Sequence, residues 1–309
     1  RGSVISFLGG GIADGAQGVD LAAIPSLAIK QVEVLRDGAS SQYGSDAIAG
    51  VMNFMLRDDA EGFEVVTRYG STFEGDGTNY MVAANLGLPI GDNGFFNISG
   101  EVRDVEGTIR SGVRTDVAYQ IANGYPIVSD FQTINSYSNE VPQYWGTPDV
   151  EDDVKLFFNS AVEINDSMEL YAFGNFAERT VAGGFYYRNP DGRDGVFTIG
   201  DYRAVGNIDG TCAYGTGASG QVDPSDYALR DTIMADPSCF LMNQIAPGGY
   251  TPRFLGNITD TSLTIGRRGD ITEGFLSGHS YDLSGSVGRN EADFGLNNTV
   301  NPSMGPDTP

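Results

Sequence analysis

Apolar and polar residues alternate along most of this chain, which is the pattern of β-strands with one apolar and one polar face. The alternation recurs in seven segments, residues 64–70, 79–88, 95–104, 153–164, 168–180, 254–267 and 274–294. In the second segment, Tyr80, Val82 and Leu86 share one face, and Ala83 and Asn85 share the other. The pattern therefore predicts an all-β protein with seven antiparallel strands.

The connections between these strands are alternately short and long. Residues 89–94, 165–167 and 268–270 have the composition of tight turns, whereas long connections lie near residues 105–152 and 181–253. By parity, the long connections all fall at the same end of the strands. Long strands with short turns at one end and long loops at the other are typical of outer-membrane β-barrels. A soluble β-sandwich, whose half-buried strands also alternate, is the alternative.

The first 57 residues have a different pattern. A glycine-rich stretch at residues 9–11 precedes a short helix or turn at residues 21–27, which Pro25 interrupts. Ile29, Val32 and Val34 predict a short buried strand, residues 36–39 and 43–46 have turn chemistry, and residues 47–56 are apolar. This order predicts a strand, a turn region and a second strand.

One block within this region resembles a known family. The sequence VEVLRDGASSQYGSDAIAGVMNF, residues 32–54, resembles the end of the plug domain of TonB-dependent outer-membrane receptors, and residues 281–306 resemble a barrel segment of the same family. The resemblance implies a fragment: the C-terminal part of a plug domain at residues 1–57, then the first strands of a barrel of about 22 strands at residues 58–309. The TonB box and the early plug strands of the family have no counterpart in the sequence.

The resemblance also implies a function. Members of this family are receptors in the bacterial outer membrane, in contact with lipid and lipopolysaccharide. They import a scarce nutrient such as an iron chelate, cobalamin or an oligosaccharide, using energy from the TonB complex of the inner membrane. Such a protein is not an enzyme and needs no cofactor. The alternative is a soluble secreted β-protein that binds carbohydrate through aromatic residues of its loops, and a third possibility is a receptor that mainly signals to a regulator.

The plug motif combines glycines that permit turns with charges that the family places inside the barrel. We expect Glu33 and Arg36 to pair with wall residues such as Glu101, Arg103 or Lys155, and solvated turn charges are the alternative. The motif residues are Glu33, Arg36, Asp37, Gly38, Tyr43, Gly44, Asp46, Gly50 and Asn53.

The long connections contain the residues that could recognise a ligand. Their aromatic side chains can stack on sugars or chelate rings, or pack the loops against each other, and their arginines can bind an anionic ligand. The candidates for ligand contact are Arg110, Arg114, Tyr144, Trp145, Tyr186, Tyr187 and Arg188.

The two cysteines lie in the second long connection. In an exported chain, Cys212 and Cys239 favour a disulfide that stiffens this loop, with two free thiols as the alternative. Metal binding is not expected, because no histidine or further cysteine lies nearby in the sequence.

Charge and composition exclude several classes of protein. The formal net charge of −23 argues against nucleic-acid binding, which needs a cationic surface. Acidic residues could hold divalent cations that bridge lipopolysaccharide, although a solvated acidic surface is the simpler interpretation. His279 is the only histidine, which excludes Ser-His-Asp catalysis and histidine-rich zinc catalysis. No run of residues is apolar and long enough for a membrane-spanning helix.

Overall fold

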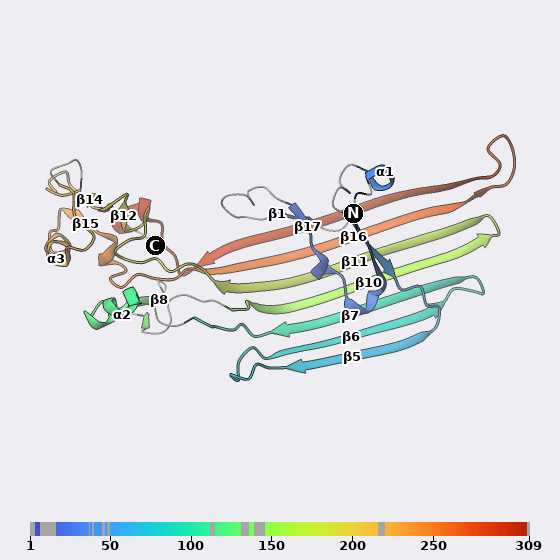
Figure 1. Ribbon diagram of the computed structural model, residues 1–309, viewed down its shortest axis with the longest axis horizontal. Helices are drawn as coiled ribbons and strands as arrows, with labels where there is room; N and C mark the ends of the chain where they lie inside the picture. Colours follow the sequence, from blue (N-terminus) through green and yellow to red (C-terminus); the bar gives the residue numbers. More distant parts are fainter. Residues whose placement is uncertain are drawn as a thin grey trace. The chain divides into compact units, whose positions relative to one another are not determined.

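The computed structural model describes residues 4–6, 17–36, 38, 40–44, 47, 50–111, 115–130, 136–138, 146–215 and 220–307 (Figure 1). The chain forms two compact units. The first, here the sheet unit, comprises Arg1–Glu106, Asp149–Val181 and Gly256–Asp293. The second, here the loop unit, comprises Gly107–Pro148, Ala182–Leu255 and Phe294–Pro309.

A seven-stranded sheet dominates the sheet unit, and Figure 1 shows its strands side by side. The strands pair in chain order, as expected for successive antiparallel neighbours. The all-β antiparallel prediction is confirmed, with all seven strands. They are β5 (Gly62–Gly70), β6 (Asn79–Pro89), β7 (Gly94–Val105), β10 (Asp149–Asn165), β11 (Met168–Gly184), β16 (Arg253–Ile271) and β17 (His279–Asn297).

Two of the three predicted tight turns are confirmed. Residues 90–93 join β6 to β7, closed by the hydrogen bond from Ile90 N to Gly94 O (2.8 Å), and residues 166–167 join β10 to β11. The third prediction is wrong, because residues 268–270 lie inside β16 and the turn comprises residues 272–278. The backbone N–H of Asp270 donates to Ser167 O (3.0 Å), and this bond continues the strand ladder past the expected turn.

Burial on this sheet is inverted relative to a water-soluble sheet. On β7, Asn97, Ser99 and Glu101 are 2%, 1% and 6% exposed, whereas Val102 is 45% exposed. On β6, Asn85 is 3% exposed and donates to Asn97 Oδ1 (2.6 Å) and Ser99 Oγ (2.8 Å). The covered face is therefore polar and internally hydrogen-bonded, and the open face is apolar.

The N-terminal segment of the sheet unit contains two short 3-10 helices and a β-hairpin. Helix η1 (Leu21–Ala23) is capped by Asp20, and η2 (Ser26–Ala28) follows the fully buried Pro25, which confirms the predicted interruption. The remaining elements are β1 (Val4–Ser6), β2 (Gln17–Val19), β3 (Ile29–Arg36), α1 (Ser40–Tyr43) and β4 (Gly50–Leu56).

The pairing of β3 with β4 confirms the predicted strand, turn region and strand. The expectation that β3 is buried is wrong, because Val32 and Val34 are 44% and 58% exposed. The polar contacts between the N-terminal segment and the sheet come from residues on either side of the hairpin, so the apolar side chains of β3 stay open.

The long connections fold into the loop unit. One buried cluster contains Phe197, Phe240, Met242 and Tyr250, and a second forms around Ile233. No helix in the described part of the chain is long and apolar enough to cross a membrane. The elements are α2 (Thr115–Ala122), β8 (Ile127–Asp130), β9 (Ser136–Ser138), β12 (Thr198–Ile199), β13 (Tyr202–Arg203), β14 (Gly206–Asn207), α3 (Tyr227–Met234), β15 (Cys239–Phe240), η3 (Met242–Gln244) and η4 (Pro302–Asp307).

The disulfide between Cys212 and Cys239 is present, with the two Cα atoms 5.1 Å apart, and confirms the sequence expectation. Cys239 is 1% exposed in the second cluster and pairs across β14 and β15 with Asn207. The Asn207 side chain accepts hydrogen bonds from the N–H groups of Gly210 (2.7 Å) and Cys212 (3.2 Å). The disulfide thus joins a polar turn to a buried strand.

Replacing both cysteines, Cys212→Ser with Cys239→Ser, is expected to destabilise the loop unit by about 3 kcal/mol, because the cross-link no longer restricts the unfolded segment. Limited proteolysis of the full-length protein checks this, with faster cleavage inside residues 212–239 as the expected result. Wild-type protein treated with reductant is the matched control and should cleave at the mutant's rate. Unchanged cleavage of the double mutant would contradict the assignment of a stabilising role.

Candidate functional site

A buried charged cluster holds the N-terminal segment against the sheet. The backbone N–H and the hydroxyl of Ser26 both donate to Glu101 Oε2, at 3.0 and 2.9 Å. Glu101 Oε1 lies 2.7 Å from Lys155 Nζ, which also lies 3.1 Å from Asp153 Oδ2. The side chains of all three charged residues are at most 6% exposed. Because isolated charges are costly to bury, this pairing is what allows them to lie beneath the segment.

A second contact between the N-terminal segment and the sheet is an ion pair. Asp20, on the N-terminal segment, accepts a hydrogen bond from Arg179 Nη2 on β11 at 2.5 Å, and both side chains are largely buried. Beyond the hairpin, Asn159 donates to Arg57 O (2.9 Å) and Asn97 donates to Asp59 O (3.2 Å). The sheet therefore binds the chain on both sides of the β3–β4 hairpin.

The predicted motif residues lie mainly within the hairpin itself. Glu33 and Asn53 are cross-strand partners, and the Asn53 amide donates to Glu33 Oε2 (3.1 Å). Gly50 has φ of 141°, and a Cβ there would lie 2.5 Å from Leu35 O, so only glycine fits. Gly44 also has positive φ, at 92°.

The other motif residues lie at the far end of this hairpin. Tyr43 ends α1 and is 55% exposed, Gly38 is exposed, and Arg36 pairs with Gly50 in the strand register. Asp37 and Asp46 lie outside the described residues. The roles assigned to these residues stay predictions.

The structure gives a different pairing from the one expected for Glu33 and Arg36. Glu101 and Lys155 do take part, but the N-terminal residues at the sheet are Asp20 and Ser26. Sequence reasoning missed these two residues. The available signal was positional: Asp20 caps one 3-10 helix and Ser26 starts the next, immediately after a proline.

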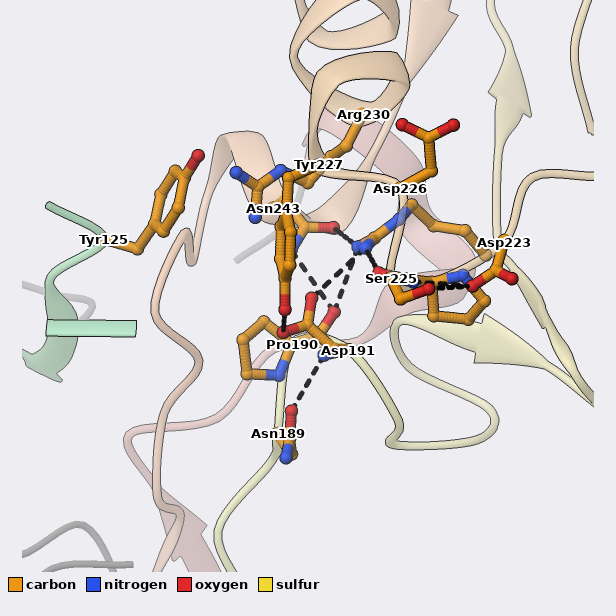
Figure 2. Close-up of polar contacts among 12 residues, drawn as sticks. Tyr125, Asn189, Pro190, Asp191, Asp223, Ser225, Asp226, Tyr227, Arg230 and Asn243 are labelled. Carbon is orange, nitrogen blue, oxygen red and sulfur yellow. Dashed lines mark hydrogen bonds and ion pairs between the residues drawn. The ribbon is translucent and has the colours of Figure 1, made fainter. Parts of the chain in front are cut away.

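Asp191 lies at the centre of a group of polar contacts in the loop unit (Figure 2). Its carboxylate accepts hydrogen bonds from Arg203 Nη2 (3.1 Å), Tyr227 Oη (2.9 Å) and the amide of Gln120. These donors come from β13, α3 and α2, so one carboxylate links both long connections.

Arg203 is buried beside this carboxylate. Arg203 is 2% exposed and also donates to Asn243 Oδ1 (3.1 Å) and Pro190 O (3.2 Å). Burial lowers the pKa of Arg203, and the hydrogen bond and charge of Asp191 oppose that change. Desolvation together with the same carboxylate raises the pKa of Tyr227, so its hydroxyl stays protonated and donates.

Arg230 is fully buried and stacks on two aromatic rings. Its guanidinium carbon lies 3.8 Å from the Tyr125 ring centroid and 4.8 Å from that of Tyr227 (Figure 2). Its Nη2 also lies 2.9 Å from Asp231 Oδ1. Tyr125 comes from the first long connection, so the stack adds a second link between the two connections.

The predicted ligand contacts occupy different environments. Tyr187 is 5% exposed and its hydroxyl donates to Gly248 O (2.6 Å), which makes it part of the packing. Tyr186 is 55% exposed, and the Arg188 guanidinium lies 5.4 Å from the Phe185 ring centroid. Burial and the charge of Arg193 lower the pKa of Arg188.

Three of the other predicted contacts lie outside the described residues, namely Arg114, Tyr144 and Trp145. Arg110 is described, and its Nη1 donates to Ile109 O (3.1 Å). The structure thus brings together Tyr186, Tyr187 and Arg188, which are adjacent in sequence. Ligand binding by any of these residues stays a prediction.

Comparison with known families identifies the N-terminal segment. Residues 6–51 match the family model of the TonB-dependent Receptor Plug Domain. This part of the chain is a TonB-dependent receptor plug segment. The matched residues include β3, the first two residues of β4 and the anchoring residues Asp20 and Ser26.

Similar solved structures include two receptors. A mutant of the ferric enterobactin receptor from Pseudomonas aeruginosa is 12% identical, with 87% of this chain and 34% of that chain covered and a TM-score of 0.37. The siderophore receptor PirA from Acinetobacter baumannii is 14% identical, with 91% and 34% covered and a TM-score of 0.37. The chain thus spans about a third of the length of these receptors.

Asp191→Asn is expected to destabilise the loop unit by about 3–5 kcal/mol, because it leaves the buried Arg203 charge without its carboxylate. Hydrogen exchange of α2 and α3 in the full-length protein should show faster exchange in both helices. Asp201→Asn, at an exposed position, is the control and should leave exchange unchanged. Equal exchange in the two variants would show that Asp191 does not organise the unit.

Lys155→Met is expected to loosen the plug segment, because it leaves Glu101 and Asp153 buried without a cation, at a cost of about 3–5 kcal/mol. The measurement is hydrogen exchange of residues 20–28 in the full-length receptor. Adding Glu101→Gln removes one of the unpaired charges and should recover part of the loss, since the two residues are coupled. Additive effects of the two substitutions would contradict a shared network.

Proposed function

We propose that this chain is part of an outer-membrane receptor that imports a scarce nutrient with energy from the TonB complex of the inner membrane. The observation that carries the proposal is a plug segment bound to the polar face of a sheet whose other face is apolar and open. The nutrient class is an iron chelate, cobalamin or an oligosaccharide. The division is plug at residues 1–57 and barrel wall at residues 58–309.

Exposure along single strands supports a lipid-facing wall. On β10, Val154 and Leu156 are 37% and 47% exposed, while Lys155 between them is 4% exposed. In water this arrangement would expose apolar side chains and bury a charge, which is unfavourable on both counts. In a membrane barrel, apolar side chains face lipid and polar ones face the lumen. In that setting the exposure of Val154 and Leu156 and the burial of Lys155 are both favourable.

The strand lengths fit the same proposal. A tilted membrane-spanning strand needs about 9–11 residues. Strand β7 has 12 residues, β10 has 17 and β16 has 19, so each is long enough to cross and to extend beyond the hydrocarbon layer. Ordinary strands in soluble proteins have about 5–6 residues.

The plug contacts suit a segment that must stay in place and yet be released. They are hydrogen bonds and ion pairs from Asp20 and Ser26, with polar wall residues as partners. When these polar groups separate in a water-filled lumen, water can hydrate them. A polar interface therefore separates more easily than an apolar interface of equal size. Transport of this kind involves binding and release of cargo, with no covalent step.

The loop unit is the part that we propose recognises the cargo. All long connections leave the sheet at the same end, opposite the tight turns. We retain Arg110, Arg114, Tyr144, Trp145, Tyr186 and Arg188 as proposed ligand contacts, on the strength of their residue types, and omit the buried Tyr187. The soluble carbohydrate-binding alternative is less well supported, because it gives no reason for the inverted burial of the sheet.

The full-length receptor is expected to extract from membranes only with detergent and to change its electrophoretic mobility on boiling. Within it, Leu156→Arg should lower the temperature of the mobility shift, since arginine on the lipid face costs about 2–4 kcal/mol near the bilayer midplane. In a soluble protein the same exposed substitution changes stability by only about 0.5 kcal/mol.

Asp166→Arg, in the tight turn between β10 and β11, is the matched control and should leave the transition temperature unchanged. A water-soluble, unshifted protein that tolerates Leu156→Arg would overturn the proposal. The secreted carbohydrate-binding protein would then be the better interpretation.

A further inference from the structure

The loop unit contains a pocket of about 470 Å³ between β12, β14, β15 and η4. Val205, Phe240 and Met242 line it, together with the backbone of Gly206. Phe240 and Met242 are 9% and 3% exposed and belong to the first buried cluster, so the floor of the pocket is part of the core. The volume lies within the range of small-molecule sites, about 300–1,000 Å³.

The lining of this pocket carries no charge. Among the described residues that line it, none is acidic or basic, although 19% of the chain is charged. Arg203, on β13, already donates hydrogen bonds to Asp191 and Asn243. An ion in the pocket would lose its hydration without gaining a counter-charge, so the chemistry selects an uncharged occupant.

One lining residue offers a specific polar contact. Thr198 lines the pocket and is 2% exposed, which places a hydroxyl-bearing residue in a mainly apolar lining. A ligand group that hydrogen-bonds to this hydroxyl would gain a directional contact. The pocket thus combines an apolar floor with two hydroxyl-bearing residues in its lining, Thr198 and Ser303.

The pocket is held open by the local structure. Gly206 pairs with Phe240 across β14 and β15, and the neighbouring pair joins Asn207 to Cys239. The disulfide from Cys239 to Cys212 fixes this strand pair to the adjoining turn. A preformed pocket needs little ordering when a ligand binds, which favours affinity for a small molecule.

We propose that this pocket binds the uncharged, mainly apolar part of a small molecule, with Phe240 and Met242 as the floor and Thr198 as the hydrogen-bonding contact. The assignment of that molecule as the cargo of the receptor rests on the proposed function. The binding site itself does not, because it is built entirely within the loop unit.

Benzyl alcohol and benzoate are suitable probes, because both contain one aromatic ring and only benzoate is charged. Saturation-transfer NMR with the detergent-solubilised full-length receptor should detect benzyl alcohol, with benzoate at least tenfold weaker. Equal signals from the two probes, or no signal from benzyl alcohol, would overturn the proposal.

Substitutions locate the site. A Cβ at Gly206 would lie 3.4 Å from Phe240 Cβ, so Gly206→Val should narrow the pocket and abolish the benzyl alcohol signal. Gly192→Val is the matched control, because a Cβ there would meet open space. Thr198→Val keeps the shape and removes the hydroxyl, and it should weaken benzyl alcohol about fivefold while toluene is unaffected. Wild-type binding by both Gly206→Val and Thr198→Val would refute the location.

The failure of this proposal is distinguishable from the failure of the receptor function. A heat-modifiable, detergent-dependent receptor that gives no signal with benzyl alcohol overturns the pocket and leaves the receptor function standing. A soluble protein that binds benzyl alcohol and excludes benzoate does the reverse.

Discussion

The sheet unit depends on the pairing of charged side chains on the face of the sheet that the N-terminal segment covers. Glu101, Asp153 and Lys155 lie on the polar face where the plug segment crosses it, with almost no exposure to solvent. Each of these groups would be strongly unfavourable alone, and together with Ser26 they form one connected network. The polar covered face, the apolar open face and the position of the plug segment are therefore three aspects of one arrangement.

Much of the sheet could be predicted from the sequence, because the alternation of side chains is a direct consequence of strand geometry. The face assignment of Tyr80 and Val82 against Ala83 and Asn85 follows from a period of two, and tertiary context did not alter it. The expected turn at Arg268 failed for a reason that lies outside its own segment. The Asp270 N–H donates to Ser167 O in the turn between β10 and β11, a contact that local turn chemistry does not reveal.

The candidate sites were less predictable, because they depend on contacts between distant residues. Residue types suggested Tyr187 as a ligand contact, yet the structure buries it against Gly248. Arg203, an arginine of the same long connection, is buried beside Asp191. An arginine in a long loop has the same sequence signature whether it binds a ligand or a buried carboxylate. The disulfide was predictable because export chemistry limits the choices for two cysteines in one loop.

The contrast between the two ends of the sheet has an evolutionary consequence. Two residues suffice to join β10 to β11, whereas the connection between β11 and β16 contains its own helices, strands and buried cluster. Insertions and substitutions in the longer segments leave the strand ladder untouched, while changes at the short turns shift the strand register. Sequence changes can therefore accumulate in the long connections, while the strand ladder limits changes at the short turns.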